Sequence, residues 1–243
     1  MATLSRKKKF TLIYFFVLLI IFLIIIFYQN GWVNALNALF PEKEQLIYPR
    51  ASISTLVWEH IQLVLLSSIL STVTGVIIAI IVTRNFGKSF LPLADNLSAI
   101  GQTFPPVAVL ALSVPFLGFG FEPTVFALFI YGILPILRNS INGFQAIPKN
   151  IHDAAEGVGM TPLQKLFKVE LPLALPYIIA GIRISVIINI GTATVGATIG
   201  AGGLGAPITA GLISNNFAYL LQGAVPAALM AFLLDAFFNL LED

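Results

Sequence analysis

The stretch RKKKFTLIYFFVLLIIFLIIIF, residues 6–27, decides which kind of fold this chain can adopt. From Phe10 to Phe27 it is uncharged and almost entirely apolar, and this run is longer than the apolar region of a secretory signal peptide. No small-residue cleavage site follows before Tyr28. We therefore expect a retained membrane-spanning helix, and the basic block before it predicts that the N-terminus stays in the cytoplasm.

The composition extends this interpretation to the whole chain. Of its 243 residues, 58% are hydrophobic and only 10% are charged, whereas soluble domains carry about 25% charged residues. The mean hydropathy of +0.94 indicates that much of the surface faces hydrocarbon. At about 20 residues per membrane-crossing helix, the length accommodates about five or six spans. We expect an all-α integral membrane protein in which residues 1–243 form a single transmembrane domain.

Several function classes are excluded by what the sequence lacks. There is no cysteine, so disulfides, thiol nucleophiles and cysteine-based metal sites are ruled out. The net charge of +2 is too small to indicate nucleic-acid binding. His60 and His152 are predicted on opposite sides of the membrane, where they do not share a metal. We expect no catalytic, cofactor-binding or metal-binding residue on this chain.

Apolar runs predict six spans, at approximately residues 10–27, 61–83, 98–117, 123–137, 173–199 and 217–240. Between the first two spans lies an outer loop, Asn30 to Arg50. The positive-inside bias supports the orientation, because most of the 13 Lys and Arg residues fall in or beside the predicted inner segments. These inner residues are Arg6, Lys7, Lys8, Lys9, Arg84, Lys88, Arg138, Lys149, Lys165 and Lys168. We therefore expect a multi-pass protein of a bacterial cytoplasmic membrane, with both termini in the cytoplasm.

Prolines interrupt two of the spans. Pro105 and Pro106 lie in the middle of the third span, and Pro135 lies in the fourth. Proline removes a backbone donor, and hydrocarbon tolerates the freed carbonyl only where protein or a water-lined cavity satisfies it. These spans are expected to face protein or a transport pathway, with a packing kink as the alternative. The candidate pathway residues are Gln102, Thr103, Pro105, Pro106 and Asn139.

The segment Pro148–Pro172 is far longer than a membrane connection requires. Apolar residues recur at helical spacing at Ile151, Ala154, Ala155 and Val158, which predicts a short amphipathic helix that two glycines end. A second short helix follows, started by Thr161, Pro162 and Gln164 and ended by Leu171-Pro172. This helix-turn-helix offers small side chains that a soluble partner can approach closely. The alternative is an interfacial helix that lies on lipid headgroups.

The same segment resembles the cytoplasmic EAA motif of binding-protein-dependent ABC importer permeases. Asp153-Ala154-Ala155, Gly159, Val169 and Leu171-Pro172 match that motif in order and spacing, with Asp153 for Glu and Val169 for Ile. The resemblance implies a fold like the type I ABC importer permeases, with a cytoplasmic coupling helix. The residues implied to couple to the ATPase are Asp153, Ala154, Ala155, Glu156, Gly159, Val169, Leu171 and Pro172.

Further stretches resemble the osmoprotectant branch of these permeases, which imports glycine betaine, choline, carnitine and related quaternary amines. They are residues 101–106, 134–139, 157–160, 169–176, 181–183 and 199–205. The resemblance implies alternating access driven by separate ABC ATPase subunits, which hold the ATP and magnesium. It also implies a second permease subunit, identical or paralogous, and an extracytoplasmic substrate-binding protein. The alternative is a secondary transporter driven by an ion gradient, which commonly holds midplane carboxylates.

Two glycine motifs look like nucleotide-binding sequences. Gly200, Gly202 and Gly205 satisfy G-x-G-x-x-G, but neither the preceding strand nor the acidic residue that the dinucleotide fingerprint needs is present. A flexible or close-packed outer re-entry is the preferred interpretation. Gly87-Lys88-Ser89 fails as a P-loop because Val82 stands where the first glycine is required.

Two charges lie inside predicted spans. Arg183 and Asp235 are expected at similar depths in the fifth and sixth spans. Because a charge in a membrane is costly, we predict that they pair, either structurally or as part of an inner gate. Independent snorkelling to the headgroups is the alternative. Glu59-His60 is interpreted as an interfacial polar pair.

Overall fold

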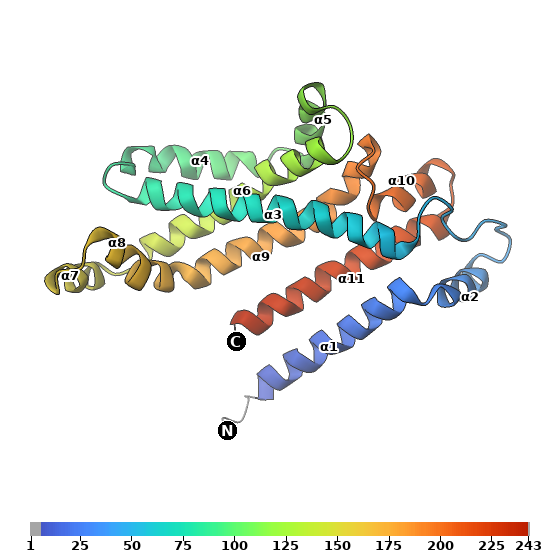
Figure 1. The fold of residues 1–243 in the computed structure, drawn as a ribbon, viewed down its shortest axis with the longest axis horizontal. Coiled ribbons are helices and arrows are strands. Elements are labelled where there is room, and N and C mark those ends of the chain that lie inside the picture. The colour runs from blue at the N-terminus through green and yellow to red at the C-terminus, as the bar shows by residue number, and fades with distance from the viewer. Residues whose placement is uncertain (1–5, 243) are drawn as a thin grey trace. The chain divides into compact units, whose positions relative to one another are not determined.

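A computed structural model describes residues 6–242, with side chains from Lys8 to Leu241. The ends of the predicted domain, residues 1–5 and 243, lie outside the described residues, as do the side chains of Arg6 and Lys7 in the predicted cytoplasmic flank. The described chain is helical without strands (Figure 1). Its elements are α1 (Arg6–Phe27), α2 (Gln29–Leu39), α3 (Ile53–Thr83), η1 (Lys88–Phe90), α4 (Leu91–Gly101), α5 (Pro106–Leu117), α6 (Phe121–Gln145), α7 (Lys149–Gly157), α8 (Pro162–Lys165), the π turn Leu166–Glu170, α9 (Leu171–Gly196), η3 (Ala197–Ile199), α10 (Gly205–Ile213) and α11 (Phe217–Glu242).

Five helical stretches in the described chain are long and apolar enough to cross a membrane, and the number rises to six if α4 and α5 form one broken span. The predicted number of six spans is therefore confirmed when α4 and α5 are counted as one broken span. Several helix ends differ from the predicted boundaries, and each difference has a physical cause.

The predicted third span is broken at its proline pair. Helix α4 ends at Gly101, and α5 begins at Pro106. Pro105 and Pro106 have no amide hydrogen to donate, and a proline disfavours the α conformation of the residue before it. Pro106 instead occupies the first position of α5, where its missing donor costs nothing.

The second and fourth spans are longer than predicted. Helix α3 begins at Ile53 because Leu56 and Val57 are already buried. Helix α6 does not end at Leu137 but continues to Gln145. The polar residues after Leu137 conceal two apolar ones, Ile141 and Phe144, which are buried in the hydrophobic core and hold this end of the helix in place.

The outer loop predicted from Asn30 to Arg50 contains a helix. Helix α2 occupies residues 29–39, and its Leu36 is only 1% exposed. After it, the chain from Gln45 to Tyr48 is held by buried polar groups near the start of α11. The side chain of Gln222 accepts from the Tyr48 amide at 3.1 Å and donates to the Leu46 carbonyl at 2.6 Å.

The second short helix of the surface segment does not end at Leu171-Pro172, which corrects the boundary predicted from the sequence. Helix α8 passes through the π turn directly into α9, and the amide of Leu171 donates to the carbonyl of Leu166 across this turn. Pro172 lacks an amide hydrogen, so the α-helical ladder is interrupted there in any case. The wider π turn carries the chain past the proline without ending the helix.

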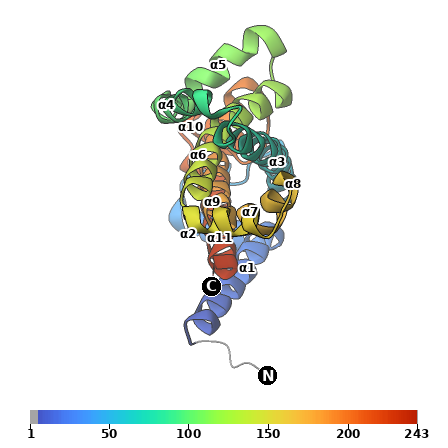
Figure 2. The same cartoon turned by 90° about the vertical axis from the view of Figure 1, so that its left-hand side faces the viewer.

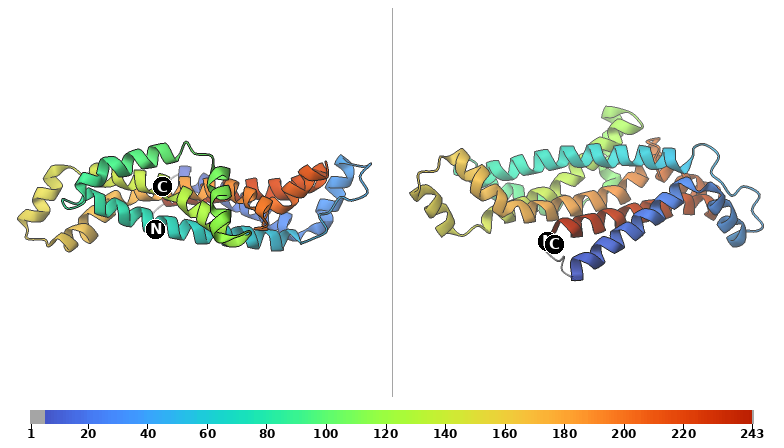
Figure 3. Two further views of the ribbon diagram at one scale, coloured as in Figure 1. Left: turned by 90° about the horizontal axis from the view of Figure 1, so that it is seen from above. Right: turned by 60° about the horizontal axis from the view of Figure 1, so that its bottom comes forward.

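The described chain divides into two compact units. Unit 1 comprises residues up to Leu66, Pro106–Leu128 and the residues from Ile187 onward, whereas unit 2 comprises Ser67–Pro105 and Phe129–Val186. In unit 1, α11 packs against α1 and α10, and the right view of Figure 3 shows α1 beside α11. In unit 2, the buried core is formed by Ala79, Val82, Ala94, Leu137, Ile141, Phe144, Ile147, Ala174 and Ile178.

The sequence leaves open whether the glycine-rich turn is flexible or close-packed. In the structure this turn, which lies in unit 1, is close-packed. Gly202 and Gly203 have positive φ, and Gly203 and Leu204 are buried. The Gly203 amide donates to Glu59 Oε2 at 2.7 Å, so Glu59 holds the turn against α3. The buried ring of His60 donates through Nε2 to the Ile190 carbonyl at 3.0 Å, which joins α3 to α9 within this unit.

Candidate functional site

The site is built on the short helix α7 of unit 2, which Figure 2 shows beside α8. Pro148, in an extended conformation, precedes its first turn. At its C-terminal end the amide of Met160 donates to the Ala155 carbonyl at 3.1 Å, and Gly159 adopts a φ of +77°. This left-handed glycine ends the helix and lets the chain reverse toward α8.

The predicted apolar stripe of α7 is divided between two faces. Ala155 is buried, and Ile151 packs against the core of unit 2. Ala154 is exposed and Val158 is 73% exposed, so only part of the predicted stripe faces the core. Residues 151 and 155 are one helical turn apart and bury the inner face, which leaves the neighbouring strip, with exposed Asp153, open to a partner.

The start of α8 confirms the predicted capping. Thr161 Oγ1 accepts from the Gln164 amide at 3.3 Å, and Gln164 Oε1 accepts from the Thr161 amide at 3.0 Å. This reciprocal pair is a capping box, which satisfies amides that a helix start leaves unpaired. Beyond it, Leu163 and Phe167 are 67% and 63% exposed.

An ion pair at the surface joins the two short helices. Lys165 Nζ lies 2.6 Å from Glu156 Oε1. This hydrogen bond and the positive charge of Lys165 lower the pKa of Glu156 from its ordinary value. Since the Glu156 side chain is 66% exposed, the contact orients the loop and adds little stability.

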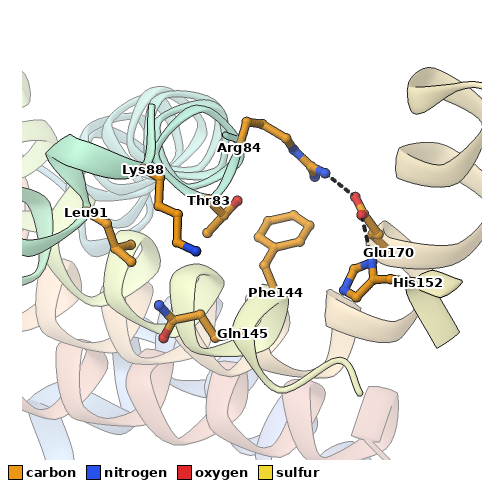
Figure 4. Close-up of a pocket in the computed structure, with 8 residues that line it drawn as sticks. All are labelled: Thr83, Arg84, Lys88, Leu91, Phe144, Gln145, His152 and Glu170. Atoms are coloured by element: carbon orange, nitrogen blue, oxygen red, sulfur yellow. Dashed lines mark ion pairs between the residues drawn. The ribbon is translucent and has the colours of Figure 1, made fainter. Parts of the chain in front are cut away.

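A buried carboxylate ties the same loop to the membrane helices. The side chain of Glu170 is only 3% exposed, and its Oε2 lies 2.5 Å from Arg84 Nη1, directly after α3. Its Oε1 lies 3.3 Å from Nδ1 of His152 on α7. The Arg84 guanidinium stands 5.7 Å from the centre of the Phe144 ring on α6, an arrangement that favours cation–π attraction. Figure 4 shows these four side chains together at one pocket.

This network, which we call the Glu170 cluster (Arg84, Phe144, His152 and Glu170), is absent from the predicted site residues. Two signals in the sequence point to it. Glu170 stands between apolar neighbours at the start of a long apolar run. Arg84 is the first charged residue after a different long apolar run, the one that forms α3. A charge next to a membrane span requires a partner. The motif residues beside Glu170 remain accessible in part, with Val169 and Leu171 half-buried and Pro172 exposed.

The candidate pathway residues are placed in two elements. Gln102, Thr103 and Pro105 are exposed in the break between α4 and α5, and Pro106 starts α5. The Tyr131 hydroxyl donates to the Gln102 carbonyl at 3.3 Å. In α6, Asn139 Nδ2 donates to the Pro135 carbonyl at 2.8 Å. That these residues line a pathway stays a prediction.

The two intramembrane charges lie in different units. Arg183 is in the part of α9 that belongs to unit 2, and Asp235 is in α11 in unit 1. Asn239 Nδ2 donates to Asp235 Oδ2 at 3.3 Å, one helical turn away. The pairing of Arg183 with Asp235 stays a prediction.

Between Lys8 and Leu241, no three His, Asp or Glu side chains gather in a group that could hold a metal ion. The described chain instead presents long apolar helices and one projecting helix pair anchored by a buried ion pair. These features are those of a membrane-embedded subunit that offers a surface beyond its long apolar helices.

Comparison with known proteins gives the family. Residues 71–243 match the model of the binding-protein-dependent transport system inner membrane components, and the chain belongs to this family. It is a permease subunit of the ABC importer class and not an enzyme, a multi-pass protein of the inner-membrane type.

Curated relatives agree with this assignment. The choline transport system permease protein OpuBB of Bacillus subtilis is 42% identical over 73% of this chain and 81% of its own length. The osmoprotectant import permease protein OsmY of Salmonella typhimurium is 40% identical over 72% of this chain and 75% of its own. Among solved structures, an inward-facing MetNI methionine ABC transporter chain superposes with a TM-score of 0.70 at 24% identity, over 77% of this chain and 93% of that one. This last likeness shows the type I importer fold.

Proposed function

We propose that this permease imports a quaternary-ammonium osmoprotectant such as glycine betaine or choline, and that ABC ATPase subunits drive it through α7 and α8. The substrate class is inferred from the relatives, which are named for choline and osmoprotectant transport. Residues 1–243 form one permease domain in this proposal. It works with a second permease subunit and an extracytoplasmic binding protein, while ATP and magnesium are held by the ATPase subunits.

One observation carries the coupling role. Helix α7 and the turn after it expose small or short residues, Asp153, Ala154, Gly157 and Gly159, while Ala155 and the Glu170 cluster fix the opposite face of the helix to the core of unit 2. Small side chains let a partner backbone approach closely. A partner that moves α7 also moves His152 and, through Glu170, the end of α3 and the start of α9.

The direct test enlarges the exposed strip. In the reconstituted transporter, Ala154→Leu is expected to abolish uptake while the isolated chain unfolds at the same temperature as the wild type, because Ala154 is exposed. The matched control is Ala228→Leu, at an exposed alanine of α11. Full uptake by Ala154→Leu contradicts the coupling role. Uptake that depends on an ion gradient without the ATPase subunits contradicts the whole proposal.

The substrate class is tested separately by competition. Uptake of labelled choline is expected to be inhibited by other trimethylammonium compounds and not by primary-amine analogues of the same size. A quaternary ammonium donates no hydrogen bonds and is recognised by aromatic faces, so the permanent cation is the feature that matters. Equal inhibition by the primary amines contradicts this substrate class.

Orientation and gating are the remaining parts of the proposal. Both termini lie in the cytoplasm in this proposal. Reporter fusions at each end test this, and a cytoplasmic signal is expected from both.

Arg183 and Asp235 pair as part of the inner gate. A double-mutant cycle of Arg183→Gln and Asp235→Asn is expected to give a coupling energy above about 0.5 kcal/mol, whereas additive effects on uptake contradict the pairing.

A further inference from the structure

Unit 2 holds a cavity behind the short helices α7 and α8. Its volume is about 810 Å³, and it lies among the end of α3, the turn after it, α7 and α8. Two carboxylates and five basic side chains line it, the basic ones being Arg84, Lys88, Lys149, His152 and Lys165. A smaller cavity of about 250 Å³ shares part of this lining and adds the amide of Gln145.

The charges of this cavity do not cancel. Both carboxylates are already engaged, Glu170 with Arg84 and with Nδ1 of His152, and Glu156 with Lys165. Lys88 and Lys149 form no ion pair with any residue whose side chain the structure describes. Buried Nε of Arg84 has no hydrogen-bond acceptor among the described residues. In Figure 4 the Lys88 ammonium points into the pocket toward Gln145. The cavity therefore offers several unused donors to an anion.

The rim of the cavity is apolar. Phe86 and Leu163 line it, and their side chains are 76% and 67% exposed. Near this end of α3, Ile77 and Ile81 are 50% and 42% exposed, so they lie on the outer face of the helix. A small inorganic anion satisfies the lysines but leaves this apolar surface uncovered. A ligand with an anionic head and acyl chains satisfies both.

We propose that this cavity binds the phosphate group of an anionic phospholipid. Lys88 and Lys149 donate to the phosphate, and the acyl chains lie along the exposed face of α3. Basic pockets at the ends of membrane helices are known to hold lipid headgroups in this way. The lipid then fills the space behind α7 and α8 and supports the position of the loop. This inference is independent of which solute the permease transports.

The experiment uses the purified full-length chain in detergent micelles and measures its unfolding temperature during lipid titration. Phosphatidylglycerol is expected to raise the unfolding temperature, whereas phosphatidylcholine with the same acyl chains is not. Lys88→Gln and Lys149→Gln are each expected to weaken the apparent affinity for phosphatidylglycerol about fivefold, and the double variant about 25-fold, because a basic residue near an anionic surface contributes about 1 kcal/mol.

The control is Lys168→Gln, at an exposed lysine that does not line the cavity, and it is expected to change the affinity less than twofold. An equal effect of phosphatidylcholine overturns the proposal without any variant. An equal loss in Lys168→Gln shows general surface attraction and overturns the site. If millimolar inorganic phosphate alone produces the whole rise, the ligand is a free anion and the lipid proposal is overturned. If the lysine variants weaken only the binding of the ATPase subunits, the lysines serve that partner instead.

Discussion

Replacing Glu170 by Gln tests whether the buried ion pair holds the coupling loop to the membrane helices. The change removes the charge and keeps the shape, so Arg84 and His152 lose their shared carboxylate. Removing one partner of a fully buried pair costs about 3–5 kcal/mol. Because the Arg84 side chain is 26% exposed and regains some hydration, we expect about 2–3 kcal/mol. For a chain of this size that corresponds to a fall in unfolding temperature of roughly 4–12 °C.

The assay is thermal unfolding of the purified full-length chain, with Glu156→Gln as the matched control. Glu156 also pairs with a basic side chain, but it is 66% exposed, so its loss is expected to cost much less than the loss of Glu170. A double variant, Arg84→Gln with Glu170→Gln, leaves no unpaired buried charge. We expect it to be more stable than Glu170→Gln alone.

The functional readout of Glu170→Gln is the ratio of ATP hydrolysed to solute imported, measured below the lowered unfolding temperature. If Glu170 links α7 to α3 and α9, this ratio rises while ATPase activity persists. The reasoning is refuted if Glu170→Gln and Glu156→Gln are equally stable. It is also refuted if the costs of Arg84→Gln and Glu170→Gln simply add, since a shared ion pair requires coupling between them.

Three further predictions concern local structure. Thr161→Ala removes the capping box and is expected to cost about 1 kcal/mol, seen as faster amide exchange at the start of α8. Gly203→Ala is expected to lower the unfolding temperature, because φ is +67° and the new Cβ lies 3.2 Å from His60 Nδ1; Gly157→Ala, with nothing within 4 Å, is expected to leave it unchanged. Lys165→Met is expected to return the lowered pKa of Glu156 toward its ordinary value of 4.5 in an NMR titration. In the wild type the stabilisation from that pair is fully present above the ordinary value and is lost as pH falls through the lowered pKa.

The sequence predicts most of the helices because apolar runs of spanning length have few alternatives in a membrane. The boundaries are less predictable, since hydropathy reports average composition and the ends depend on individual contacts. Ile141 and Phe144 extend α6 through a polar-looking segment because they are buried in the core of unit 2. In the same way, Leu36 stabilises a helix in what the sequence presents as a loop.

The sequence predicts where α7 lies along the chain, but not which of its side chains face the core and which stay exposed. The spacing of apolar residues places Ile151, Ala154, Ala155 and Val158 on one side of a helix, and a stripe of that width spans more than the core contacts. Only Ile151 and Ala155 face the core. A hydrophobic pattern gives no information on how much of an apolar face its own chain covers and how much is left for another subunit.

The position of Glu170 depends on a local feature that the pattern conceals. In a continuous α-helix from Leu163, residues 167 and 170 fall at i+4 and i+7 and share one face. In the structure Leu163 and Phe167 are 67% and 63% exposed, whereas Glu170 is 2% exposed. The π turn at residues 166–170 accounts for the difference, because one additional residue in a turn rotates the later residues of the helix by about 100°. This rotation directs Glu170 inward toward Arg84 and leaves the two apolar residues outside. Deleting Val169 removes the additional residue and leaves Glu170 six residues after Leu163, about 240° around a continuous α-helix, which is the inward direction. This variant is therefore expected to destabilise the loop less than Glu170→Gln in thermal unfolding, and an equal loss contradicts this account of the turn.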